Sequence, residues 1–263
     1  MSELHAVAHK MVEKGKGILA ADESTPTCTK RFASINTDST AESRNFYRNM
    51  LFTTEDIEKY ISGVILFDET FHQSELSSGT KFPEYLTSKN ILPGIKVDQG
   101  LEDFSPYEKL TKGLDGLSER LGKYYALGAR FAKWRAVITP GDSIPTDDCI
   151  LANAKNLAKY AKKCQQANLV PIVEPEVLMD GVHTIDESFD ITSRTLNMVF
   201  DQLDEHNVSL QGIVLKPNMI LSGYECSYQA SIEEVAEKTV NCLSANVPSE
   251  VPGIAFLSGG QSD

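Results

Sequence analysis

The chain has 263 residues, of which 41% are hydrophobic and 24% are charged, and its formal net charge is −12. These values are typical of a globular protein and exclude a disordered, collagen-like or coiled-coil chain. The excess of acidic residues argues against nucleic acid and anionic membranes as partners, although a local basic pocket can still bind an anionic small molecule.

The five cysteines are widely spaced and form no Cys-x-x-Cys pair. This pattern fits neither a disulfide scaffold nor a structural zinc site, and it indicates a reducing compartment. The first residues are polar and charged, unlike a signal peptide, and no apolar run approaches the roughly 18–20 residues that cross a membrane. We therefore expect a cytoplasmic protein without membrane partners. The five histidines are scattered, so we also expect no metal site.

Short apolar runs alternate with longer helical patterns along the chain. Seven such runs predict strands, and they cover residues 17–22, 61–67, 91–98, 129–138, 169–176, 212–217 and 253–260. Capping signals predict helix starts near Ser39, Ser105 and Ser231, and a stripe of apolar side chains with helical spacing follows Thr146. Strands that alternate with helices pair in parallel, because each parallel connection needs a crossover.

Seven strand–helix units without a GxGxxG or Walker motif favour a TIM (β/α)8-type barrel over a doubly wound sheet. No Gly/Ser-rich or Pro-rich linker divides the chain, which predicts a single domain over residues 1–263. The sequence reaches Asp263 directly after the seventh predicted strand. We therefore expect an α/β barrel with only seven strands present, truncated before the eighth.

Charged or polar side chains stand at the end of almost every predicted strand. In a parallel barrel these ends meet on one face, where active sites are built. Any one lysine there could simply extend its ammonium to water, but three of them beside carboxylates indicate a functional site. The glycines after the last strand suit phosphate binding by backbone N–H groups. The set comprises Asp22, Lys96, Asp98, Lys133, Arg135, Glu174, Glu176, Lys216 and Ser258.

Lys216 ends an apolar strand, and an amine in such a place can attack a carbonyl to form an imine. Imine formation needs a proton donor that expels water, a role that Glu174 or Glu176 can fill. Cleavage of a carbon–carbon bond then needs a base on the substrate hydroxyl, and Asp22 is placed for that. Positive charge and the Ser-Gly-Gly turn would hold phosphate. Together these residues predict Schiff-base chemistry on a phosphorylated ketose.

Five segments resemble class I fructose-bisphosphate aldolases, and the resemblance runs through all 263 residues in order. It implies reversible cleavage of fructose 1,6-bisphosphate into dihydroxyacetone phosphate and glyceraldehyde 3-phosphate, without a metal or other cofactor. It also implies a homotetramer. The segments are GILAADES (17–24), FAKWR (131–135), PIVEPE (171–176), GIVLKPNM (212–219) and FLSGGQS (256–262).

The resemblance implies roles for single residues. Lys216 corresponds to the Schiff-base lysine, Glu174 to a general acid/base and Asp22 to the aspartate of the first loop. Members of the family continue into an eighth strand with a phosphate-binding arginine, and then into a tail with a catalytic tyrosine. The sequence up to Asp263 contains neither the strand nor the tail. The other implied site residues are Lys133 and Glu176 in catalysis, and Arg135, Lys96, Ser258, Gly259, Gly260, Arg31 and Thr27 in substrate binding.

Two alternatives stay open on the sequence. The same Schiff-base chemistry could serve another sugar phosphate, in a different aldolase or a transaldolase-like enzyme. The chain could also be a non-catalytic fragment or a binding protein, because a barrel that lacks one strand leaves two open edges with unpaired backbone groups.

Overall fold

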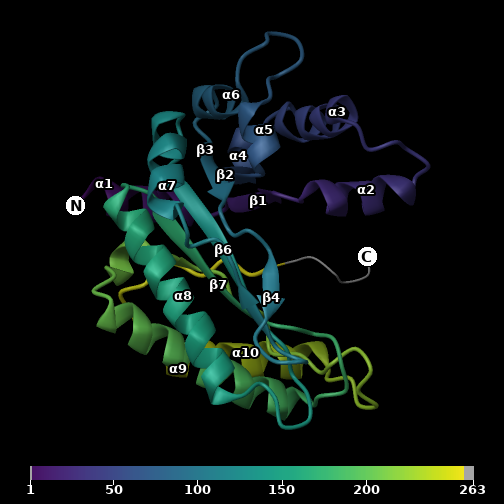
Figure 1. Cartoon of the computed structure of the whole chain (residues 1–263), viewed down its shortest axis with the longest axis vertical. Coiled ribbons are helices and arrows are strands. Elements are labelled where there is room, and N and C mark those ends of the chain that lie inside the picture. Colours follow the sequence, from purple (N-terminus) through teal and green to yellow (C-terminus); the bar gives the residue numbers. More distant parts are fainter. Residues whose placement is uncertain (1, 258–263) are drawn as a thin grey trace.

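The computed structural model describes residues 2–257, and a parallel sheet of six strands forms its centre. Neighbouring strands are all parallel, as the alternation of strands and helices predicted. The sheet curls into a half-barrel (Figure 1). In spatial order its strands are β1 (Gly17–Ala21), β2 (Ile61–Leu66), β3 (Leu92–Lys96), β6 (Phe131–Ile138), β7 (Val170–Val177) and β8 (Val214–Leu215).

The seventh predicted strand forms only in part within the described residues. Its first residues make one parallel bridge, between Leu215 and Ile254. The backbone N–H of Leu215 donates to the carbonyl of Gly253, and the backbone N–H of Ala255 donates to the carbonyl of Leu215. Within the described residues the structure thus has six paired strands and this bridge, and residues 258–260 of the predicted seventh strand lie outside the description.

Helices form the crossovers between these strands, mostly outside the curled sheet (Figure 1). The helix α1 (Glu3–Met11) precedes the first strand. The crossovers contain α2 (Thr25–Ala33), α3 (Ala41–Phe52), α4 (Ile57–Tyr60), α5 (Asp68–His72), α6 (Phe82–Ser88), α7 (Leu117–Ala126), α8 (Asp147–Gln166), α9 (Ile185–Glu205) and the 3-10 turn η1 (Leu210–Gly212), and α10 (Ile232–Asn246) follows β8.

Local signals explain where the long helices begin. The hydroxyl of Ser231 accepts from the backbone N–H of Glu234, so this predicted start is confirmed, and the hydroxyl of Thr146 accepts from the backbone N–H of Cys149 at the start of α8. The start near Ser39 lies one residue later, at Thr40, where a capping box pairs Thr40 with Ser43. The apolar stripe of α8 is buried, as its spacing predicted, at Ile150, Ala154, Leu157, Ala158, Ala161 and Cys164.

The prediction of a helix that starts at Ser105 is wrong. That segment is a two-stranded antiparallel hairpin of β4 (Leu101–Asp103) and β5 (Lys109–Thr111). The carboxylate of Glu108 turns inward and accepts from the backbone N–H and the hydroxyl of Thr146. Glu108 therefore caps the start of α8 instead of the first turn of a helix of its own.

Two apolar layers position the strand ends. Between the sheet and the outer helices lies the main core, which includes Trp134 and Tyr160 stacked 5.5 Å apart. Inside the curl, Phe131 packs in a second cluster with Ala8 and Met11 of α1, so this helix closes the amino end of the half-barrel. The carboxyl ends of the strands are left for polar side chains.

Candidate active site

Four of the predicted residues meet above the sheet: Asp22 follows β1, Lys133 and Glu174 lie within β6 and β7, and Lys216 follows β8. Glu174 lies between two lysines: one carboxylate oxygen pairs with Lys216 Nζ, and the other is 3.1 Å from Lys133 Nζ. Lys133 Nζ is also 3.2 Å from Asp22 Oδ2. The backbone N–H of Lys216 donates to the carbonyl of Val173, which continues the ladder beyond β8 and holds the lysine beside Glu174.

This cluster is removed from water. Glu174 is 2% exposed and Lys133 is 6% exposed. Burial alone would lower the pKa of the Lys133 ammonium, but the carboxylates of Glu174 and Asp22 outweigh it and raise that pKa above its ordinary value. Lys133 is therefore a fixed cation at neutral pH, placed to attract an anionic or polarised oxygen.

A second pair lies two residues further along the same strands. Arg135 Nε donates to Glu176 Oε2 across β6 and β7. Burial would lower the pKa of Arg135, but the hydrogen bond and charge of Glu176 raise it. On the other side of β6, Lys96 is in register with Lys133, and its ammonium pairs with the Asp98 carboxylate.

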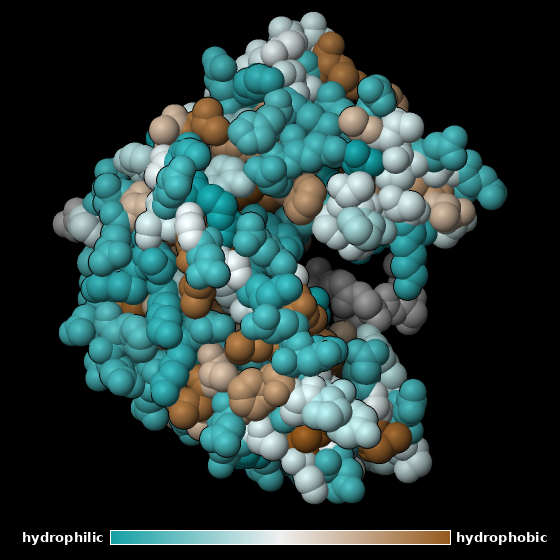
Figure 2. All heavy atoms as spheres, in the orientation of Figure 1, coloured by the Kyte–Doolittle hydropathy of each residue, from teal (hydrophilic) through white to brown (hydrophobic). Residues whose placement is uncertain are grey.

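A cleft of 1140 Å³ opens above these strand ends. The predicted residues that line it are Asp22, Thr27, Lys96, Asp98, Lys133 and Arg135. Figure 2 shows the molecule hollowed below α2, between mostly hydrophilic side chains. Lys216 instead lines a smaller cavity of 370 Å³, beside β1 and Ile254. Lys133 lines the cleft, and Glu174 contacts both Lys133 and Lys216. These two residues thus connect the cleft with Lys216.

The remaining predicted residues lie at the edge of this arrangement or outside the description. Thr27 on α2 lines the cleft, and its hydroxyl is 3.0 Å from that of Ser24. Arg31, one turn later, does not line the cleft and pairs with the Glu23 carboxylate. The Ser-Gly-Gly turn at 258–260, namely Ser258, Gly259 and Gly260, lies outside the described residues.

The structure adds residues that the sequence reasoning missed. Glu23 lines the cleft and is held by Arg48 and Tyr47 of α3. A signal was available: Arg44, Arg48 and Phe52 share one face of α3 at steps of four, and Arg48 and Phe52 are buried. An arginine on the inner face of an amphipathic helix needs a buried acceptor, and the carboxylate in the AADES segment is that acceptor.

Metal ligands do not gather among the described residues. No group of three or more His, Cys, Asp or Glu side chains between residues 2 and 257 is arranged to hold a metal ion. No helix in this part of the chain has the length and apolar character needed to span a membrane.

The chain matches a family model over residues 3–263, that of the glycolytic fructose-bisphosphate aldolase class I. A probable fructose-bisphosphate aldolase class 1 from Xanthomonas axonopodis pv. citri is 53% identical over 100% of this chain and 79% of its own length. Fructose-bisphosphate aldolase 1 from Toxoplasma gondii is 51% identical over 99% of this chain and 73% of its own length.

A solved structure supports the same assignment. The fructose-bisphosphate aldolase of Plasmodium falciparum, solved in complex with TRAP and a small-molecule inhibitor, superposes with a TM-score of 0.96 at 49% identity. The alignment covers 98% of this chain and 76% of that chain, so the half-barrel corresponds to a large part of the aldolase TIM barrel. The order of strands, the residues at their ends and the match over almost the whole chain lead to one conclusion: the chain belongs to the class I fructose-bisphosphate aldolases, the lyases of glycolysis.

Proposed function

We propose that Lys216, Glu174, Lys133 and Asp22 carry out the aldolase reaction through a Schiff base on Lys216. The observation that carries the proposal is the position of Glu174, whose two oxygens face the ammonium groups of Lys216 and Lys133. A proton can therefore pass between Glu174 and Lys216 without side-chain movement. The substrate of the family is a sugar phosphate, here fructose 1,6-bisphosphate.

Formation of the imine uses the Lys216–Glu174 pair. Glu174 takes a proton from the Lys216 ammonium, and the free amine attacks the ketone carbon of the open-chain sugar. Glu174 then returns a proton to the carbinolamine hydroxyl, which leaves as water and gives the iminium. The buried position of Glu174 keeps this exchange local.

Cleavage uses the other end of the cluster. The Asp22 carboxylate accepts the proton of the C4 hydroxyl, the bond between C3 and C4 breaks, and its electron pair moves into the iminium to form an enamine, while C4 to C6 leave as glyceraldehyde 3-phosphate. Lys133, 3.2 Å from Asp22, stabilises the oxygen on which charge develops. Protonation of the enamine and hydrolysis of the imine release dihydroxyacetone phosphate and restore Lys216.

The proposed binding residues surround this core. Arg135 and Lys96 contribute positive charge in the cleft, and Glu176 fixes the orientation of Arg135. The remaining contacts to the two phosphates are assigned to Thr27 and Arg31 at one end of the substrate and to Ser258, Gly259 and Gly260 at the other.

The Lys216→Met variant tests this assignment, because it keeps the aliphatic stem and removes the amine. We expect kcat for cleavage of fructose 1,6-bisphosphate to fall by at least about 10³-fold, the scale seen when the nucleophile of a covalent mechanism is removed. Far-UV circular dichroism should match that of the original chain. A variant that keeps more than a tenth of the activity would refute the role of Lys216.

The family resemblance also supports a homotetramer in the cytoplasm, and the five cysteines, all free thiols, suit a reducing compartment. Sedimentation equilibrium tests the assembly: four chains of 29.0 kDa each are expected to sediment together, and a monomer would contradict the assignment.

A further inference from the structure

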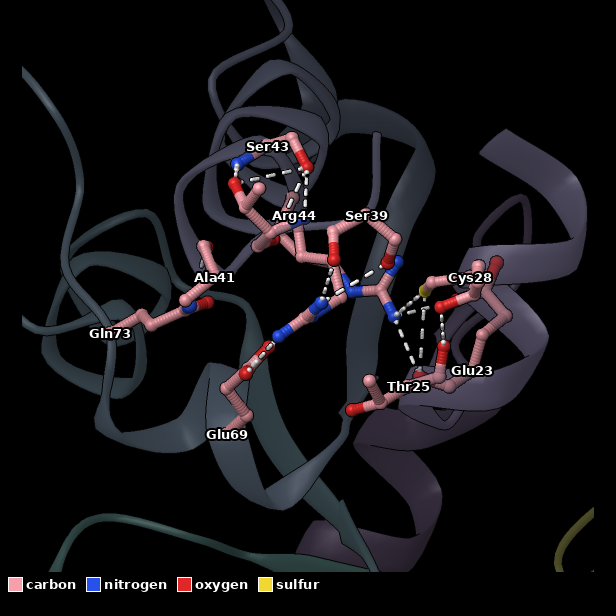
Figure 3. Close-up of polar contacts among 12 residues, drawn as sticks. Glu23, Thr25, Cys28, Ser39, Ala41, Ser43, Arg44, Glu69 and Gln73 are labelled. Carbon is pink, nitrogen blue, oxygen red and sulfur yellow. Dashed lines mark hydrogen bonds and ion pairs between the residues drawn. The ribbon is translucent and has the colours of Figure 1, made fainter. Parts of the chain in front are cut away.

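The carboxylate of Glu23, next to Asp22 in the chain, is the meeting point of three donors. Arg31 of α2 pairs with Oε1, Arg48 Nη2 of α3 is 2.9 Å from Oε2, and the Tyr47 hydroxyl donates to Oε1 over 3.1 Å. In Figure 3, Glu23 lies beside Cys28 at the right, and the separate pair of Arg44 and Glu69 lies further to the left. Glu23 also lines the cleft.

The two arginines differ sharply in how they are held. The Arg48 side chain is 2% exposed, and Nη2 also donates to the Glu23 carbonyl over 3.1 Å. Its guanidinium lies 4.8 Å from the centre of the Tyr47 ring. The Arg31 side chain is 62% exposed, and Glu23 is its one ion-pair partner among the described residues. Arg48 is therefore a fixed partner of Glu23, whereas Arg31 can leave.

The charges allow that departure. One carboxylate faces two guanidinium groups, so the cluster carries a net charge of +1. When Arg31 leaves, the buried pair of Glu23 and Arg48 stays neutral, and no isolated charge remains in the interior. A phosphate competes well for an arginine, because it accepts two parallel hydrogen bonds from one guanidinium.

We propose that Glu23 is a positioning residue that holds Arg31 at the edge of the cleft and releases it when Arg31 binds the sugar phosphate. The proposal rests on the phosphate contact assigned above to Arg31. Contacts lead from Lys216 through Glu174 and Lys133 to Asp22, and Glu23 follows, so Arg31 serves the phosphate at the far end from the imine. Binding of that phosphate then includes the cost of breaking the Arg31–Glu23 pair.

A charge-neutral double variant, Glu23→Gln with Arg48→Met, tests the proposal. It removes one negative and one positive charge together, leaves no unpaired buried ion and frees Arg31. The readout is the dissociation constant of a hexitol 1,6-bisphosphate, which lacks the ketone and so binds without reacting with Lys216, measured by calorimetry. We expect binding about threefold to fivefold tighter, the scale of a partly exposed ion pair that no longer competes.

A matched control uses the neighbouring pair one turn earlier on α3. Glu69→Gln with Arg44→Met also removes a carboxylate and the guanidinium that it binds. Neither residue lines the cleft, so this variant should leave the dissociation constant unchanged. Tyr47→Phe provides a second test of opposite sign: it removes a fixed donor from Glu23, strengthens the hold on Arg31 and should weaken binding of the bisphosphate.

Three results would overturn the proposal. The first is unchanged or weaker binding of the bisphosphate by the Glu23/Arg48 variant. The others are equally tighter binding when Glu23 and Arg48 are replaced in a chain that already carries Arg31→Gln, and tighter binding by Tyr47→Phe. If Arg31→Gln alone leaves the dissociation constant unchanged, the phosphate contact itself is wrong. Reductive trapping of dihydroxyacetone phosphate on Lys216 reports on the Schiff base independently, so a failure of the positioning role and a failure of the proposed mechanism are distinguishable.

Discussion

At the scale of single residues, the proposed mechanism depends on the position of Glu174. Its carboxylate bridges Lys216 and Lys133, and both lysines reach it from neighbouring strands of the sheet. A carboxylate that contacts the reacting amine directly can act first as base and then as acid. Glu176, two residues later on the same strand, instead pairs with Arg135 and is suited to orientation.

Replacement of Glu174 by Gln keeps the shape of the side chain and removes its proton exchange. We expect kcat to fall by about 10²- to 10³-fold, which is within the range that general acid–base catalysis contributes. Steady-state kinetics with fructose 1,6-bisphosphate measures this loss. Asp186→Asn, which removes a carboxylate paired with Lys238 on the surface, is the control and should keep full activity. Equal losses in the two variants would contradict the role of Glu174.

The sequence was informative for this cluster for a physical reason. Parallel strands place their carboxyl ends on one face, so Asp22, Lys133, Glu174 and Lys216 could be predicted to converge. Which lysine touches which oxygen depends on the register of β6, β7 and β8, and nothing in the sequence encodes that register directly. The spacing of Arg44, Arg48 and Phe52 could have indicated that Arg48 faces inward, but its partner Glu23 follows a strand about 25 residues earlier, and helical periodicity does not identify such a partner.

Close packing inside the half-barrel is the main constraint at the scale of elements. A Cβ atom on Gly94 of β3 would lie 2.2 Å from the ring of Phe131 on β6. A Cβ atom on Gly63 of β2 would lie 2.9 Å from the same ring. The two glycines therefore make room for a fully buried Phe131, which fills the centre of the curl.

Gly94→Ala should lower the free energy of unfolding by about 1–3 kcal/mol, because the added methyl group overpacks the core. Gly122→Ala is the control: it lies in α7, where an added Cβ meets nothing within 4 Å. That change should raise the free energy of unfolding by about 0.4–1 kcal/mol, since it restricts the unfolded chain. Urea unfolding measures both values, and a neutral Gly94→Ala would show that Phe131 can move.

The loop between α5 and α6 carries a pH-dependent contribution to stability. The carboxylate of Glu75 accepts from the hydroxyl and the backbone N–H of Ser78 and from the backbone N–H of Ser77. The hydroxyl of Ser78 and these N–H groups lower the pKa of Glu75 from an ordinary 4.5 to about 2. Since the folded-state pKa is the lower one, this contribution is present above about pH 4.5 and is lost as the pH falls through about 2.

The test compares the original chain with Glu75→Gln. The difference between their free energies of unfolding should be largest near neutral pH and should shrink steadily below about pH 4.5, as Glu75 of the unfolded chain becomes protonated. Urea unfolding at a series of pH values gives this difference. A difference that stays constant with pH would show that the ionised carboxylate is not what orders the loop.

Turn chemistry explains why one element could not be predicted. Ser105, Pro106 and Glu108 read as a helix start, since Pro suits the first turn and Glu the second or third position. In the fold, Glu108 is 2% exposed and is bound by Thr146, more than 30 residues later in the sequence. This long-range contact outweighs the local preference and leaves the segment as the turn of the β4–β5 hairpin.

The alternation of strands and helices was sufficient to predict the architecture of the whole molecule. Six of the seven predicted strands pair in the expected parallel order, and the seventh contributes the bridge at Ile254. β1 pairs only with β2 among the described strands, so the curl is open between β1 and β8. The chain spans 79% of the length of its Xanthomonas relative.

The electrostatic pattern also belongs to the whole molecule. The chain carries a formal net charge of −12, yet Lys96, Lys133, Arg135 and Lys216 gather at one end of the sheet. Each of these cations has a carboxylate partner in the structure. The site is therefore polar and its cations are paired with carboxylates, and on the proposed function the phosphates of the sugar compete with these carboxylates for the cations.

Reductive trapping on Lys216 tests the central claim most directly. Dihydroxyacetone phosphate is added to the 263-residue chain, sodium borohydride reduces any imine to a stable secondary amine, and peptide mass spectrometry locates the adduct. We predict one adduct, on Lys216, which is absent from Lys216→Met and persists when a chelator is present. An adduct on Lys96 or Lys133 instead, or no adduct on the original chain, would contradict the proposed mechanism.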